Sequence, residues 1–213
     1  MRHSNRRNPG RLRIAKERRA ASRAEAFVRN YSFPVSLSRR VLLASQALDE
    51  QSWTLVERGL REWFICCAWR GSMVLGMPSR IVDSAWHEFI LDSLAYSNFC
   101  RASFGEYLHH TPDESIGDAA GSLAEAVRAW DRSEAGSSNE SVLWNIDAEL
   151  GIRQGIGIGT DELHDARTRI PYRAASGWIV GGTYKESVEG RVRGFGGGCT
   201  TGGGCGGGCG AGA

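Results

Sequence analysis

The chain has 213 residues, 41% of them hydrophobic, so it can bury the core of one ordinary domain but is not obviously long enough for two. Its net charge of +2 is unevenly distributed, because residues 1–30 carry ten Lys or Arg against two acidic residues. No apolar run has membrane length and none near the N-terminus looks like a secretory signal, so we expect a cytoplasmic protein without a membrane partner.

Residues 1–26 are predicted to form a basic, disordered arm. Arginine is frequent here, and Leu12 and Ile14 are the main apolar residues. Residues 1–24 could also be an upstream extension from a start codon chosen too early. In a second interpretation the clustered arginines contact nucleic acid or an acidic partner and release counterions. No aromatic residue lies among these arginines, so stacking on single strands is not favoured.

Helical spacing of apolar residues predicts one compact, mainly α-helical domain over residues 27–170. Within it, Asp49 is expected to open a long helix that ends near Gly71. Cys66 and Cys67 lie next to each other on the apolar face of this helix. They are predicted to be small hydrophobic residues of the core, and a disulfide framework is not expected.

Residues 77–112 hold three of the five histidines. Ser79 is a suitable N-cap for a helix that runs to about Ser93, since its side chain can satisfy an amide of the first turn. After a short break near Leu94, a second helical run is expected to end at Gly105 or a little later. The stretch therefore predicts two consecutive helices followed by a histidine-bearing segment.

Asp83 and His87 lie four residues apart on the first of these helices, so their side chains share one flank. Such a pair can supply two ligands for one metal or orient an imidazole with a carboxylate. His110, or less favourably His109, could complete the group if the second helix folds back toward the first. Two histidines and one carboxylate with open positions suit zinc with a water, or iron. Cys100 is a further candidate ligand or nucleophile, although its apolar helical position favours the core.

A structural interpretation of the same residues stays open. Asp83 could bond a backbone amide, His87 could satisfy a buried partner, and His109 and His110 could complement the dipole at the end of a helix. The protein would then be a non-catalytic interaction scaffold, and its arm or tail would contact the partners. No complete catalytic signature is present, so the sequence names neither a reaction nor a substrate.

Further along the chain, Gly155, Gly157 and Gly159 resemble a phosphate-binding loop only superficially, because no strand precedes them and the Lys-Ser/Thr ending is missing. The remaining predicted elements are helices over residues 119–130, 142–150 and 160–169, a surface loop over 133–140, and an irregular or short β segment over 171–193.

Residues 194–213 form the predicted disordered tail, with twelve glycines and three cysteines. So much glycine buries too little apolar surface to offset its chain entropy. Cys199, Cys205 and Cys209 could hold a soft metal as thiolates, although their five- and three-residue gaps differ from the spacing of a zinc knuckle. A flexible tether, or an anchor for a protein partner, is the alternative.

The stretch 77–112 resembles the signature of bacterial glycine-rich domain-containing proteins. It is also similar, more distantly, to plant glycine-rich domain proteins, in which Asp, two residues, Trp-His, one residue and His follow one another. Phe89 stands here where the plant pattern has its second histidine. The resemblance covers roughly residues 33–160 and the tail, and implies no established activity. The residues that carry it are Met77-Pro78-Ser79, Val82-Asp83, Trp86 to Leu91, Tyr96, Phe99-Cys100, Phe104-Gly105, Leu108 to Pro112 and Leu143 to Ile152.

Overall fold

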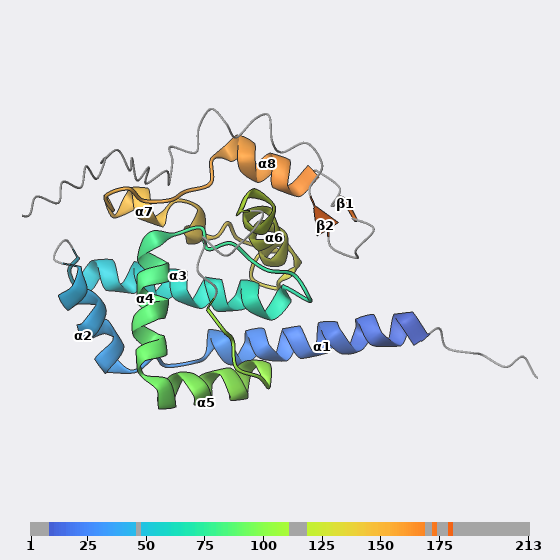
Figure 1. Ribbon diagram of the computed structural model, residues 1–213, viewed down its shortest axis with the longest axis horizontal. Helices are drawn as coiled ribbons and strands as arrows, with labels where there is room; N and C mark the ends of the chain where they lie inside the picture. Colours follow the sequence, from blue (N-terminus) through green and yellow to red (C-terminus); the bar gives the residue numbers. More distant parts are fainter. Residues whose placement is uncertain (1–8, 46–47, 111–118, 169–171, 174–178, 181–213) are drawn as a thin grey trace, which may run out of the picture. The chain divides into compact units, whose positions relative to one another are not determined.

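The computed structural model describes residues 9–45, 48–110, 119–168, 172–173 and 179–180, and the protein is mainly α-helical, as predicted (Figure 1). The two short strands pair antiparallel, with Tyr172 opposite Val180. None of the helices in these ranges has the length and apolar content needed to cross a bilayer. In chain order the elements are α1 Pro9–Arg29, α2 Val35–Ala44, α3 Glu50–Trp69, α4 Arg80–Leu91, α5 Ser93–Phe104, α6 Ala119–Arg132, the 3-10 helix η2 Val142–Trp144, α7 Ile146–Glu149, α8 Thr160–Thr168, β1 Tyr172–Arg173 and β2 Ile179–Val180.

Helix α3 is central to the packing, because it contacts α1, α4 and α6 (Figure 1). Asp49 caps it as predicted, accepting a hydrogen bond from the backbone amide of Ser52 at 2.8 Å. Its Phe64 is fully buried and lies 4.7 Å from Phe99 of α5, measured between ring centroids. Aromatic side chains bury the largest apolar areas, so this cluster is a main source of hydrophobic stabilisation.

A buried carboxylate connects α7 to the start of α4. Asp147 is 1% exposed and accepts hydrogen bonds from Ser79 Oγ and the Arg80 amide, each at 2.7 Å. It also accepts one from the Ile156 amide at 2.7 Å. A Cβ atom at Gly155 would lie 2.6 Å from the Asp147 Cβ, so only glycine lets the chain pass this close. Both oxygens of the buried carboxylate have hydrogen-bond donors, which offsets much of the cost of removing the group from water.

Glu62 of α3 makes an equivalent connection to the start of η2. This carboxylate is 6% exposed and accepts hydrogen bonds from Ser141 Oγ at 2.7 Å and the Val142 amide at 2.8 Å. Arg58, one turn earlier on α3, donates to its other oxygen at 2.8 Å. The first amides of a helical turn have no partner within the helix, so a carboxylate at this position is favourable.

The loop over residues 133–140 is exposed for most of its length, as predicted, but its beginning is held by a third buried carboxylate. Glu25 of α1 accepts hydrogen bonds from the amides of Glu134 at 3.0 Å and Ala135 at 2.8 Å. It also accepts one from Trp69 Nε1 at 2.6 Å. Helix α1 is therefore fixed both to α3 and to the segment that follows α6.

The N-terminal region differs from the sequence-based expectation. Residues 9–26, predicted as part of a disordered arm, belong to α1, which begins at Pro9. Proline favours the first turn of a helix, and Ala, Arg, Leu, Lys and Glu are good helix formers. The helix is also stabilised by packing against the core, where it buries the side chains of Ala21, Ala24 and Val28. Residues 1–8 and the predicted tail over 194–213 lie outside the described residues.

Replacing Asp147 with alanine is expected to lower the free energy of unfolding by about 3 kcal/mol or more, because buried donors of α4 lose a charged acceptor. Urea denaturation followed by circular dichroism measures this loss. Glu149→Ala is the matched control, since Glu149 is exposed on the same short helix and its removal should change stability by less than about 0.5 kcal/mol. Equal losses in the two variants would contradict the anchoring role of Asp147.

Candidate metal centre

Helix α4 positions two of the three candidate ligands. Ser79 caps it as predicted, and its Oγ accepts a hydrogen bond from the Val82 amide at 3.2 Å. Phe89 is fully buried and Trp86 is 5% exposed, which sets the face of α4 that points to the core. Asp83 and His87 fall on the flank between that face and solvent, with side chains 32% and 53% exposed.

The third candidate ligand follows α5. Asp92 caps this helix by accepting from the Ala95 amide at 3.3 Å, so the break between α4 and α5 falls at Asp92 rather than near Leu94. The helix ends at Phe104, and the capping residue Gly105 has a φ of 77°, a left-handed conformation that glycine adopts at low cost. The segment that follows Gly105 brings His110 into contact with Asp83.

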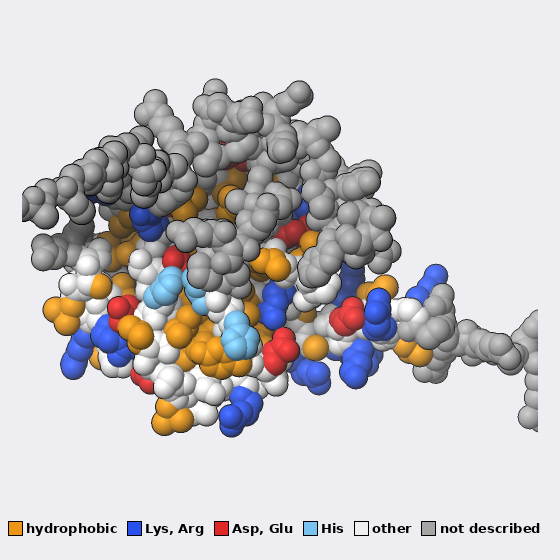
Figure 2. All heavy atoms as spheres, in the orientation of Figure 1, with side chains coloured by type: hydrophobic (Ala, Val, Ile, Leu, Met, Phe, Trp, Pro, Cys, Tyr) orange, Lys and Arg blue, Asp and Glu red, His pale blue; other side chains and the backbone are white. Residues whose placement is uncertain are grey.

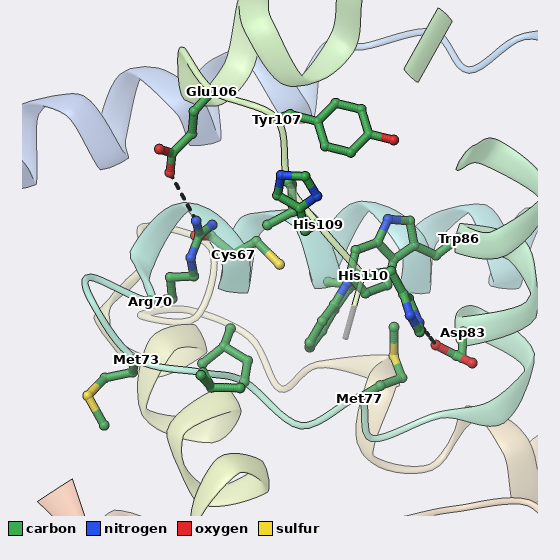
Figure 3. A pocket seen from close by; sticks show the side chains of 14 residues that line it. Cys67, Arg70, Met73, Met77, Asp83, Trp86, Glu106, Tyr107, His109 and His110 are labelled. Carbon is green, nitrogen blue, oxygen red and sulfur yellow. Dashed lines mark hydrogen bonds and ion pairs between the residues drawn. The ribbon is translucent and has the colours of Figure 1, made fainter. Parts of the chain in front are cut away.

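The three side chains form a compact group. His110 Nε2 lies 2.9 Å from Asp83 Oδ1, and His87 Nδ1 lies 3.3 Å from Asp83 Oδ2. The centroids of the two imidazole rings are 4.2 Å apart. One donor atom from each of the three residues lies within 4.8 Å of the others. Figure 3 shows the Asp83 carboxylate and the His110 ring directed toward each other.

Two buried residues that the sequence analysis did not assign to the site hold His110 in place. The Tyr96 hydroxyl donates to the Leu108 carbonyl at 2.6 Å and accepts from Trp86 Nε1 at 2.9 Å. The Trp86 ring also packs on His110, with 4.6 Å between ring centroids. Tyr96 lies in an apolar helical run, and a buried tyrosine hydroxyl needs a hydrogen-bond partner. This requirement is the feature of the sequence that could have pointed to its structural role.

A cavity of about 290 Å³ adjoins the group. Asp83 and His110 lie at one end of it, and Arg70 and Glu106 lie at the other, joined by an ion pair of 3.2 Å (Figure 3). Trp63 also lines the cavity, and its indole nitrogen has no hydrogen-bond partner among the described residues. The remaining lining residues are mostly apolar: Cys67, Met73, Val74, Leu75, Met77, Trp86, Tyr107 and Leu108, with His109 beside them.

The other candidate residues lie apart from this group. His109 lines the same cavity, but its ring packs against Tyr107 with 4.9 Å between centroids. Cys100 is fully buried in the core, and burial raises the pKa of its thiol, which disfavours a nucleophilic role. Burial likewise raises the pKa of the Cys67 thiol to about 12.

The tail cysteines Cys199, Cys205 and Cys209 lie outside the described residues. Phe89, at the position of the second histidine in the plant pattern, is fully buried in the aromatic cluster of the core. The second histidine that approaches Asp83, after His87, is His110, which comes from a different segment of the chain.

The fold and this group define a mainly helical protein with a candidate Asp-His-His metal centre at the edge of its core. Residues 23–168 match the UCP032817-like family model, and the chain belongs to this family. No curated protein and no solved structure matches it. The matched region begins within α1 and ends with α8, so it includes all three residues of the group.

Replacing Tyr96 with phenylalanine is expected to lower the free energy of unfolding by about 1–3 kcal/mol, because the Leu108 carbonyl and Trp86 Nε1 lose a buried partner. Chemical denaturation measures the change. Tyr107→Phe serves as the control, since the Tyr107 side chain is 41% exposed and its ring packing is preserved. A Tyr96 variant as stable as the control would show that this hydroxyl does not hold the His110 segment.

Proposed function

We propose that the chain binds a transition metal, zinc or iron, through Asp83, His87 and His110. The observation that carries this proposal is the meeting of one carboxylate and two imidazoles within 4.8 Å. Two histidines and one carboxylate are a known ligand set for catalytic zinc and for non-haem iron, and in both cases coordination positions remain for water or substrate.

The hydrogen bonds of His87 leave a suitable ligand atom. Its Nδ1 lies 2.8 Å from the Asp83 carbonyl oxygen, which can only accept, so Nδ1 carries the proton. The neutral ring then has its lone pair on Nε2. Histidine ligands in metal sites commonly donate their second N–H to a carbonyl or carboxylate in this way, which fixes the tautomer and the orientation of the ring.

A bound metal would take the place of the hydrogen bond between Asp83 and His110. Nε2 and Oδ1 are 2.9 Å apart, with one proton between them. Two ligands of a tetrahedral zinc with bonds of about 2.0–2.1 Å lie about 3.3 Å apart. The substitution of a metal for the proton therefore needs only a small displacement of these two atoms, whereas the exposed His87 must move further.

The cavity gives the centre access for a small molecule. Its volume of about 290 Å³ is at the lower end of ligand-binding sites, and its walls are mainly apolar. A metal in such a site supplies a Lewis acid or a water of lowered pKa. The class of chemistry that fits is hydrolysis with zinc or oxygen chemistry with iron.

A non-catalytic interaction scaffold is the second candidate function. It is favoured by the observation that the Asp83 carboxylate already has a hydrogen bond with His110 Nε2 at 2.9 Å without a metal, while His87 Nδ1 bonds the Asp83 carbonyl oxygen. A protein partner bound through the tail belongs to the same proposal. The likeness to bacterial glycine-rich domain-containing proteins and a cytoplasmic location stay predictions.

Metal analysis of the full chain, purified without an affinity tag, separates the two functions. About one zinc or iron per chain is expected, and Asp83→Ala, His87→Ala and His110→Ala should each release it. Loss of an outer partner alone already lowers metal affinity about 10–100-fold, so loss of a ligand should lower it further. Inductively coupled plasma mass spectrometry measures the content, and circular dichroism verifies that the variants fold.

Matched controls distinguish this centre from other metal-binding residues. His109→Ala removes a neighbouring imidazole outside the group, and His164→Ala removes an exposed one on α8. Both variants should keep the metal, as should a chain with Cys199, Cys205 and Cys209 replaced by serine. A folded chain without metal, or metal lost only from the serine variant, contradicts the proposal and favours the scaffold.

A further inference from the structure

The N-terminal half of α1 is a second surface with its own chemistry. Every residue from Gly10 to Ala20 is exposed. The helix continues past α3 and α5 here, and Figure 2 shows Lys and Arg side chains gathered over it. The exposed cations of α1 before its last turn are Arg11, Arg13, Lys16, Arg18, Arg19 and Arg23.

The buried and basic faces of α1 point in different directions. Ala21, Ala24 and Val28 face the core at helical spacing. Lys16, Arg19 and Arg23 have the same spacing, and at about 100° per residue their mean direction lies about 140° from that of the buried set. The stripe of three cations therefore faces solvent while the opposite side of the helix is anchored.

The basic segment is presented as a preformed helix. Glu25, on the buried side, accepts from Trp69 Nε1 and from two amides after α6, so the helix is fixed at its C-terminal half. Among the described residues, the segment over 10–20 shows one ion pair, between Arg13 and Glu17 at 3.7 Å, with both side chains largely exposed. Its other charges face water, and a fixed helix loses little conformational freedom on binding.

We propose that this half of α1 binds the phosphate backbone of duplex DNA, without sequence specificity, from the major groove. Four of the five cations over residues 10–20, and Arg23 beyond them, are arginines, whose planar guanidinium matches phosphate oxygens in a bidentate manner. The major groove of B-DNA is about 12 Å wide and admits an α-helix, with phosphates on both sides. Cations spread around most of the helix circumference suit that environment.

Other polyanions fit this helix less well. Duplex RNA has a deep, narrow major groove that does not admit a helix. A membrane surface requires an apolar face, whereas the exposed Leu12 and Ile14 point about 160° apart on the helix. Duplex DNA is therefore the partner that the shape and charge of α1 favour, independently of the metal proposal.

The test measures binding of the full chain to a short duplex DNA of mixed sequence by fluorescence anisotropy at several salt concentrations. Each phosphate neutralised contributes about −0.9 to the slope of log affinity against log salt. Replacing Lys16, Arg19 and Arg23 with glutamine should make that slope shallower by about three units and weaken binding about ten-fold or more at about 0.1 M salt.

Two further variants make the result specific. Replacing Arg39, Arg101 and Arg153 with glutamine removes the same charge from exposed positions on other segments and should leave the slope unchanged. Arg19→Lys with Arg23→Lys keeps the charge and should keep the slope. An equal loss in the first of these variants, or tighter binding to duplex RNA or anionic phospholipid vesicles than to DNA, overturns the proposal.

Discussion

The candidate centre depends on one buried charge, the Asp147 carboxylate. It binds Ser79 Oγ and the backbone amides of Arg80 and Ile81, so the position where α4 begins is fixed. A buried carboxylate cannot exchange these donors for water, and any shift of the helix would leave it unpaired. Asp83 follows one turn later on the same helix, so this interaction also fixes the position of Asp83 at the edge of the core.

The site then combines a rigid side and an accessible side. Trp86 and Tyr96 are buried, and their hydrogen bond connects α4 to α5 and to the segment that carries His110. His87 is half-exposed, so it can adjust its side chain to a ligand without disturbing the core. A metal centre needs this division, because fixed ligands give selectivity while an open side admits the metal and the substrate.

Local patterns in the sequence predicted most of the helices and the pairing of Asp83 with His87, because caps and helical spacing act over a few residues. The sequence favoured His110 over His109 as the third member, but the hydrogen bond from the Tyr96 hydroxyl to the Leu108 carbonyl, which holds this segment, could not be predicted because it joins residues twelve positions apart. The role of Glu25 could not be predicted either, because the amides of Glu134 and Ala135 that it accepts from lie 109 and 110 positions away. The basic composition of residues 9–26 did not reveal that they form a helix, because their apolar side chains are buried only from Ala21 onward.

The most direct test of the account is X-ray absorption spectroscopy at the zinc edge, on the full chain loaded with one equivalent of zinc. The account predicts nitrogen and oxygen ligands at about 2.0–2.1 Å, with the multiple scattering of two imidazole rings and no sulfur. Sulfur ligands at about 2.3 Å would contradict it, because they would assign the metal to the cysteines Cys199, Cys205 and Cys209 rather than to Asp83, His87 and His110.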